Sequence, residues 1–321
     1  ATAWGALAIY YSNSSAEGFR KTAAILFALF GAALLAWYLF SAHRRRALLI
    51  FSVSFLLLLA WWSTIKPRQD RDWAVEYTKP PYAVVNGDLV TIHNIRNFDY
   101  RSETEFVPRY YSKTFDLRKL DSVDLSATYW MGDAIAHIML SFGFGGEDFL
   151  AVSIETRRER SEGYSSLAGF FKQYELFYIV ADERDVIRLR TNYRKNPPED
   201  VYLYRIQRPP ENARRLFLDY IREINSLAER PAFYNTLTTN CTTSIVTHTH
   251  VNPGSLPLSW KILVSGYTPQ YLYEQGRLDT SLPFEELKRR SHINAAAQAA
   301  GNATDFSQRI REGLPAMAER R

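Results

Sequence analysis

The sequence predicts an α+β protein in which a transmembrane helical hairpin precedes a domain with an antiparallel sheet. Two long uncharged segments lie near the start of the chain, and a series of short strand-like segments with turn signals follows them. One amphipathic helical segment and one segment around a single cysteine come after the strands. Strands followed by helices are typical of α+β domains rather than of alternating α/β folds.

The predicted hairpin occupies residues 22–65. TAAILFALFGAALLAWYLFSA, residues 22–42, has 21 residues without a charge, and ALLIFSVSFLLLLAWWSTI, residues 47–65, has 19. Each segment is long enough to cross a hydrocarbon core of roughly 30 Å as a helix. A pair of buried helices in a soluble core would show a polar stripe on at least one helix, and neither segment has one. A pair of membrane spans therefore fits both segments.

The short loop between the two segments predicts the orientation of the hairpin. This loop, HRRR, holds three arginines in four residues, so the positive-inside rule assigns it to the cytoplasm. Residues 1–21 and the chain after about residue 66 are then extracytoplasmic, and we expect a signal peptide or an earlier membrane helix before residues 1–21. Four basic residues on the other side weigh against this orientation: Arg20, Lys21, Lys66 and Arg68.

Length, charge and cysteine content restrict the function of the extracytoplasmic part. Residues 66–321 are enough for one sizeable domain with a full core. A net charge of +5 and a pI near 9.1 suit a protein lying against anionic membrane headgroups. Nucleic acid is not expected as a partner, because acidic residues interrupt the basic ones throughout and the domain is extracytoplasmic. With one cysteine the chain forms no internal disulfide, and an unpaired thiol outside the cytoplasm points to a reactive role.

The elements of this part follow from local patterns. Residues 66–83, rich in proline and charge, predict an extended linker. From there to about residue 204 the pattern is mostly strand-like, with hairpin turns at Asn86-Gly87 and at GGED, residues 145–148, and with ELFYIVADERDVIRLRTNYR continuing the sheet. ARRLFLDYIREINSLAER, residues 213–230, has helical spacing, and FEELKRR predicts a short helix. The domain ends near residue 293, and residues 294–321 form a partly helical tail.

Cys241 lies in the polar stretch TTNCTTSIVTHTH, which is an unusual setting for a structural cysteine. A cysteine nucleophile needs a histidine as base and gains acidity at a helix N-terminus. Thr239 or Asn240 is the expected N-cap, which places Cys241 in the first turn of a helix. The Asn240 side chain and the Cys241 backbone N–H are then candidate donors to an oxyanion.

His137 is the best candidate base among the six histidines. It lies in the apolar strand AIAHIMLSF, where a lone imidazole needs a partner; a core histidine bonded to backbone is the alternative. If GGED turns the chain near residue 146, His137 faces Glu155 across the hairpin, and a register shift of two selects Ser153 instead. His248 and His250 lie seven and nine positions from Cys241, too far along a helix to reach its sulfur, and are interpreted as solvated and dispensable.

Three arginines in the predicted strand segment suit recognition of a phosphate headgroup. In ERDVIRLR, Arg188 and Arg190 share one face of a strand, and Arg194 follows. For any single one of them, ion pairing with Glu183 and Asp185 is the more common alternative.

Several blocks in order resemble one known family. AHIMLSFGF, FLAVSIETRRE, YELFYIVADERDVIRLRTNYR and FYNTLTTNCTT match the pattern of the Lnb N-terminal periplasmic domain family over roughly residues 72–265. The order of a histidine strand and a later cysteine helix is also similar to the circularly permuted, papain-like NlpC/P60 and lecithin–retinol acyltransferase group. The resemblance implies a permuted papain-like domain over residues 84–293, with Cys241, His137 and Glu155 as catalytic residues.

The resemblance further implies a lipoprotein N-acyltransferase of the bacterial inner membrane, with its catalytic domain on the periplasmic side. A phospholipid is then the acyl donor and a lipoprotein the acceptor, and the implied chemistry uses neither a metal nor a cofactor. Two alternatives remain open at this point. A hydrolase of the NlpC/P60 kind, acting on peptidoglycan peptides or lipid esters, uses the same dyad with water as acceptor. A non-catalytic, membrane-anchored binding module is the third reading.

Overall fold

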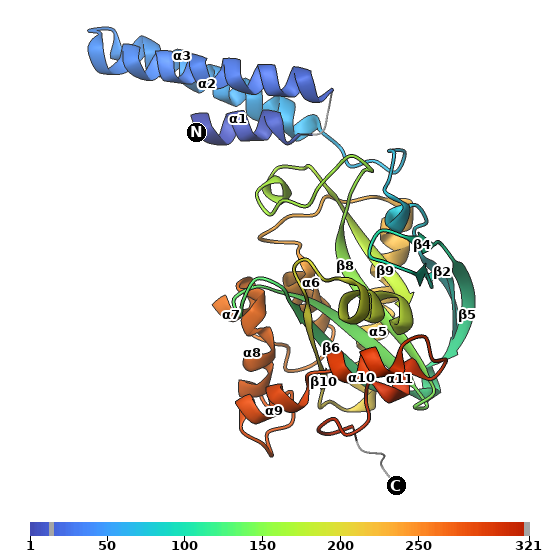
Figure 1. Ribbon diagram of the computed structural model, residues 1–321. Coiled ribbons are helices and arrows are strands. Elements are labelled where there is room, and N and C mark those ends of the chain that lie inside the picture. Colours follow the sequence, from blue (N-terminus) through green and yellow to red (C-terminus); the bar gives the residue numbers. More distant parts are fainter. Residues whose placement is uncertain (13–15, 318–321) are drawn as a thin grey trace. The chain divides into compact units, whose positions relative to one another are not determined.

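The computed structural model describes residues 1–12 and 16–317 (Figure 1). It contains two compact units, which we call the helical unit and the sheet unit. The helical unit consists of Ala1–Asp72, Thr156–Leu176 and Pro231–Thr236. The sheet unit consists of Trp73–Glu155, Phe177–Arg230 and the chain from Leu237 onwards. The fold is a mixed α+β fold with a mostly antiparallel sheet, as the sequence predicts.

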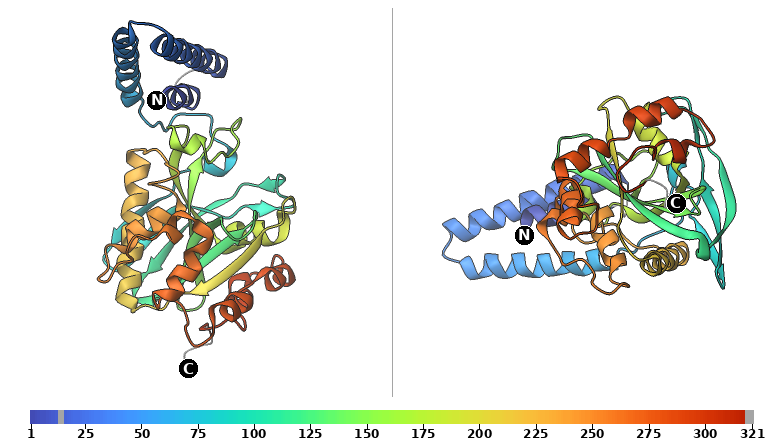
Figure 2. Two further views of the ribbon diagram at one scale, coloured as in Figure 1. Left: turned by 90° about the vertical axis from the view of Figure 1, so that its left-hand side faces the viewer. Right: turned by 90° about the horizontal axis from the view of Figure 1, so that it is seen from below.

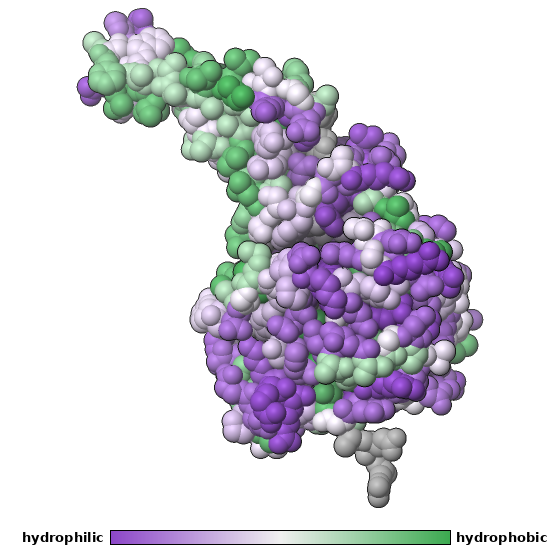
Figure 3. Space-filling model, viewed as in Figure 1, coloured by the Kyte–Doolittle hydropathy of each residue, from purple (hydrophilic) through white to green (hydrophobic). Residues whose placement is uncertain are grey.

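The helical unit contains two helices that are long and apolar enough to cross a membrane, α2 (Glu17–Phe40) and α3 (Arg44–Thr64). Only 17% and 6% of their most apolar stretches are buried inside the protein, so they are not core helices of a soluble domain. Figure 3 shows hydrophobic residues gathered along both of them. The helices agree with the predicted segments 22–42 and 47–65, and α2 begins five residues earlier because the polar turn before Thr22 is also helical.

A third helix, α1 (Thr2–Tyr10), packs against this hairpin and was not predicted. A side chain at Gly5 would overlap Phe27 and Leu58, and one at Gly31 would overlap Thr2, so glycines allow the helices to approach closely. The Trp4 ring makes edge-on contacts with Phe55 and Trp62. The apolar stretch of α1 is too short to be recognised as a membrane span.

Two cationic side chains connect the end of α3 with the segment that follows it and with Thr156–Leu176. The Lys172 ammonium group donates to the carbonyl oxygens of Trp62 and Ile65, at 2.9 and 3.1 Å, at the C-terminal end of α3, where the helix dipole favours a cation. Arg71 forms ion pairs with three carboxylates, those of Glu159, Glu162 and Glu175. Residues 66–72 are therefore held in place inside the helical unit.

The sheet unit is built on eight strands in the order β1-β2-β9-β8-β7-β6-β10, with β5 also paired to β2, and a separate pair β3–β4. The strands are β1 (Tyr82–Asn86), β2 (Leu89–Arg96), β3 (Asp99–Tyr100), β4 (Phe106–Val107), β5 (Tyr110–Asp116), β6 (Leu120–Tyr129), β7 (Ala136–Phe144), β8 (Asp148–Arg157), β9 (Glu175–Asp182) and β10 (Asp200–Arg205). Both predicted hairpins form. Gly87 takes a φ of +61° in the β1–β2 turn, and β7 pairs with β8 around residue 146.

Helices cover both faces of this sheet (Figure 2). α5 (Pro210–Glu229) and α6 (Cys241–Thr249) lie on one face, where Phe142 of β7 contacts the rings of Phe217 and Tyr220. The other face packs against α10 (Asn294–Ala300) and α11 (Phe306–Arg309), with Met139 in that core. The remaining helices are α4 (Glu183–Arg188), α7 (Trp260–Leu263), α8 (Thr268–Glu274) and α9 (Phe284–Arg290). α5 and α9 agree with the predicted helices.

The segment ERDVIRLR corrects one prediction. It forms α4 and, from Leu189 to Tyr193, a π-helical turn instead of continuing the sheet. Asp182 starts the helix by accepting from the backbone N–H of Arg184, and acidic residues in the first turn favour a helix N-terminus. The apolar residues Val186 and Ile187 are buried in the core. A short apolar run of this kind is compatible with a buried helix as well as with a buried strand, so the sequence pattern does not distinguish them.

Candidate active site

The single cysteine is the first residue of α6, and its position is set by a complete capping box. The Asn240 side-chain oxygen accepts from the backbone N–H groups of Thr242 and Thr243, at 3.0 and 2.9 Å. The Thr243 hydroxyl in turn accepts from the Asn240 backbone N–H at 3.0 Å. Asn240 is therefore the N-cap, one of the two residues predicted, and Cys241 is half-buried at the positive end of the helix.

His137 lies in β7, and the β7–β8 register brings two polar side chains of β8 to its ring. The ladder runs from Phe144–Asp148 to Met139–Ser153, so His137 is opposite Glu155, which confirms the predicted register. The imidazole Nε2 is 2.6 Å from the Ser153 hydroxyl and 3.2 Å from Glu155 Oε1. The sequence left Glu155 and Ser153 as alternative partners of His137. In the structure both side chains contact the ring, and Ser153 also donates a hydrogen bond to Glu155.

The hydrogen bonds around Ser153 decide which nitrogen of His137 carries the proton. The Ser153 hydroxyl has one hydrogen, and it donates this to Glu155 Oε1 at 2.6 Å. Ser153 must therefore accept from Nε2–H of His137. In the neutral imidazole this leaves Nδ1 as the basic nitrogen, which is the arrangement that a histidine needs to take a proton from a thiol.

Cys241 and His137 interact, and each shifts the pKa of the other toward the charged pair. Burial opposes ionisation of the thiol, but the hydrogen bond to His137, the charge of that ring and the backbone N–H of Ile138 outweigh it, so the pKa of Cys241 is lowered. Burial likewise opposes the charge on His137, but the Glu155 carboxylate prevails and raises the pKa of His137 to about 9. The site therefore favours a thiolate–imidazolium pair.

Glu155 keeps its charge although it is buried. Burial raises its pKa, but the neighbouring His137, Arg190 and Ser153 lower it well below the ordinary range of a glutamate. The Arg190 guanidinium lies 3.9 Å from Glu155 and 3.1 Å from Glu199. Arg190 thus contacts the Glu155 carboxylate that orients His137. The sequence did not reveal this contact, because Arg190 and Glu155 are far apart along the chain.

The three arginines predicted to bind a phosphate headgroup are engaged with protein groups. Arg188 donates to Asn302 Oδ1 at 2.6 Å and to the carbonyl oxygen of Arg184 at 2.9 Å. Arg190 and Arg194 both form ion pairs with Glu199, at 3.1 and 2.8 Å. The assumed strand that aligned Arg188 and Arg190 is absent, since both belong to the helical segment. These contacts favour ion pairing, but with other partners than predicted, because Glu183 pairs with Arg311 and Asp185 with Arg96.

The other histidine of α6 occupies a separate site. His248 is buried, with Nε2 2.8 Å from the Tyr178 hydroxyl and Nδ1 2.8 Å from Asp219 Oδ2, and it stacks on Tyr220. The interpretation of His248 as solvated is therefore wrong, because the inward face of α6 carries it into the core. His250, by contrast, is exposed. Within residues 1–12 and 16–317, no group of three or more His, Cys, Asp or Glu side chains could hold a metal ion.

Five exposed apolar side chains, which we call the apolar rim, lie on the segment just before β7 and on or beside α7. It consists of Met131, Ile135, Leu258, Trp260 and Leu263, all exposed, with Leu258 at 84% and Trp260 at 59%. The Thr242 hydroxyl donates to the carbonyl oxygen of α7 residue Ile262 at 2.8 Å, so α7 lies beside the start of α6. The Ser265 hydroxyl accepts from the backbone N–H of Ala136, which connects the segment after α7 to the start of β7.

Comparison with known proteins identifies the domain that carries these residues. Residues 106–266, half of the chain, match the Lnb N-terminal periplasmic domain. The match includes β7, β8 and the start of α6. No curated protein and no solved structure matches the chain. The family and the two apolar helices together indicate a membrane-anchored protein with a periplasmic domain.

Proposed function

Since the chain belongs to the Lnb N-terminal periplasmic domain family, we propose that it is a thiol acyltransferase of the bacterial inner membrane. It moves an acyl chain from a phospholipid, through a thioester on Cys241, to the N-terminal amine of a lipoprotein. The observation that carries this proposal is the hydrogen-bonded series Cys241–His137–Ser153–Glu155. We assign the sheet unit to the circularly permuted papain-like type, because its histidine strand precedes its cysteine helix.

The reaction has two halves. In the first, the Cys241 thiolate attacks the ester carbonyl carbon of the phospholipid, the C–O bond breaks, and the His137 imidazolium gives its proton to the departing lysophospholipid oxygen. In the second, the lipoprotein amine attacks the thioester, His137 takes a proton from the nitrogen, and the thiolate leaves. The Cys241 backbone N–H, in the first turn of α6, and the Asn240 amide are the proposed donors to the oxyanion.

The apolar rim supports a lipid rather than a cell-wall peptide as the first substrate. Exposed large apolar side chains cost free energy in water and mark surfaces that contact apolar partners. Trp260 is of the type enriched at membrane–water interfaces. A hydrophilic peptidoglycan stem peptide gains nothing from such a rim, so a hydrolase of the NlpC/P60 kind is the less supported alternative.

Incubation of the purified protein with phospholipid alone is expected to produce an acyl thioester on Cys241. A transferase must retain the acyl group until an amine arrives, so the adduct should accumulate when no acceptor is present. Intact-protein mass spectrometry will detect the acyl mass increment, and neutral hydroxylamine should remove it. Cys241→Ser is the matched control without a thiol. Absence of the adduct in a single-turnover experiment, together with cleavage of cell-wall fragments, would favour the hydrolase.

Replacing Glu155 by glutamine is expected to shift the basic limb of the pH–activity profile to lower pH. The first half requires a thiolate and an imidazolium, and the imidazolium is lost as the pH rises through the His137 pKa of about 9. The Glu155 carboxylate is the main cause that raises this pKa, so its removal lowers the pKa and ends activity at a lower pH. Profiles of kcat/KM against pH for the wild type and Glu155→Gln test this. Superimposable basic limbs would show that Glu155 does not set the His137 charge.

A further inference from the structure

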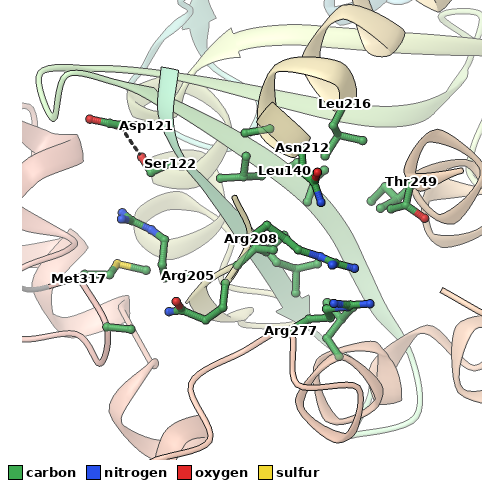
Figure 4. A pocket seen from close by; sticks show the side chains of 18 of the residues that line it. Asp121, Ser122, Leu140, Arg205, Arg208, Asn212, Leu216, Thr249, Arg277 and Met317 are labelled. Atoms are coloured by element: carbon green, nitrogen blue, oxygen red, sulfur yellow. Dashed lines mark hydrogen bonds between the residues drawn. The ribbon is translucent and has the colours of Figure 1, made fainter. Parts of the chain in front are cut away.

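A large cavity lies in the sheet unit beside α5 and α6 and extends to residues at and after α11, such as Met317 (Figure 4). Its volume of about 1240 Å³ is above the range typical of sites for drug-sized ligands. Residues of the sheet, α5, α6 and α8 line it, together with residues of the segment from Gln308 to Met317. Cys241 and His137 are not part of its lining, although their neighbours Thr242 and Ile138 are. The cavity and the candidate catalytic residues therefore share a wall.

The inner part of the cavity is apolar. Leu140 of β7, Leu216 of α5, Val246 of α6 and Leu272 of α8 contribute to it, and all four are largely buried. Well-packed cores seldom leave open space between aliphatic side chains. A cavity lined in this way suits an aliphatic chain, because such a ligand restores the missing dispersion contacts and loses its own exposure to water.

Two arginines at one side of the cavity have no carboxylate partner among the described residues. Arg208 and Arg277 each donate to the carbonyl oxygen of Gly254, at 3.2 and 2.9 Å. Figure 4 shows their side chains next to each other in the lining. Burial in the first place, and then the neighbouring charge of Arg277, lower the pKa of Arg208. Arg205, which also lines the cavity, differs because it is paired with Asp124 at 2.5 Å.

The hydrogen-bonding capacity of the two guanidinium groups is only partly used. Each guanidinium carries five N–H donors, and a single carbonyl oxygen serves both groups. Arg277 Nε is buried and has no hydrogen-bond partner within the described part of the chain. Two adjacent cations with free donors are complementary to a carboxylate or a phosphate, which would remove the repulsion and accept forked hydrogen bonds.

We propose that this cavity binds an anionic amphiphile with one acyl chain, its carboxylate or phosphate head on Arg208 and Arg277 and its chain among the aliphatic side chains along α6. The head lies on the side of Thr249, the last residue of α6 (Figure 4). Cys241 is the first residue of this nine-residue helix, roughly 12 Å away along its axis. The site is therefore separate from the position of a phospholipid ester under attack, and it does not depend on the proposed reaction.

Photolabelling tests this site in the full-length protein in zwitterionic phosphatidylcholine nanodiscs. The probe is a palmitic acid analogue with a diazirine in its chain, and the matched probe is the corresponding alcohol. We expect the acid to label peptides of α5 and α6. The alcohol should label them about tenfold less, because it has no carboxylate to accept hydrogen bonds from Arg208 and Arg277. Cys241→Ala should be labelled like the wild type. Equal labelling by acid and alcohol would overturn the proposal.

Variants of the two arginines provide the second arm. Arg208→Gln combined with Arg277→Gln is expected to reduce labelling at least tenfold, and the double lysine variant should recover part of it. Arg289→Gln combined with Arg290→Gln removes the same charge from the exposed surface of α9 and should have no effect. Competition with excess oleate, which carries a carboxylate, or with excess lysophosphatidic acid, which carries a phosphate, then identifies the preferred head group. The preferred competitor should displace more of the probe. Unchanged labelling in the Arg208/Arg277 variant, labelling confined to α2 and α3, or displacement by neither competitor would overturn the proposal.

Discussion

Replacing Cys241 by serine is expected to abolish acyl transfer, with a loss of about 10³-fold or more, while the protein remains folded and membrane-bound. Serine has nearly the same shape, but its hydroxyl is far less ionised at neutral pH than a thiol whose pKa is lowered by His137. The capping box of α6 is made by Asn240 and Thr243, so the substitution leaves the helix start intact. Lipoprotein acylation, measured by mass spectrometry of lipoprotein N-termini, is the readout.

The controls for this variant separate chemistry from folding. Thermal unfolding and membrane fractionation should match the wild type, because Cys241 contributes no disulfide and is only half-buried. Cys241→Ala should be equally inactive and equally stable. A purified, correctly folded Cys241→Ser protein with full activity would exclude Cys241 as the nucleophile.

Replacing His137 by alanine is expected to reduce activity as severely as the loss of Cys241, because members of one catalytic unit fail together. The variant should also change the thiol itself. Without the hydrogen bond and charge of His137, the pKa of Cys241 should rise, and alkylation by iodoacetamide near neutral pH should slow by roughly tenfold for each unit of the rise. Cys241 is the only cysteine, so the alkylation rate measures this site alone.

The matched control is His250→Ala, since His250 is exposed just beyond the end of α6 and should be dispensable. His248→Ala is unsuitable as a control, because it removes the partner of Asp219 and Tyr178 inside the core and should destabilise the fold. An inactive His250→Ala variant with an active His137→Ala variant would reverse the assignment of the base.

Much of the fold was predictable because its signals are local. The hydrocarbon-length segments, the turn at Asn86-Gly87 and the helical spacing of α5 each depend on neighbours within a few residues. Two features of the candidate site were also predictable from local signals. The GGED turn sets the β7–β8 register and so places His137 opposite Glu155, and the short stretch around Asn240 contains its own capping box.

The tertiary structure decided what local patterns left ambiguous. The sequence determined two long apolar helices, a largely antiparallel sheet, and a hairpin that brings the histidine strand next to Glu155 or Ser153. Only the packed fold decided that ERDVIRLR is helical, that α6 lies against β7 so that Cys241 meets His137, and that Arg208 meets Arg277 beside an apolar cavity. The physical reason is distance along the chain. Periodicity, turns and caps act over a few residues, whereas these contacts join segments from tens to about a hundred residues apart and depend on how the helices pack on the sheet.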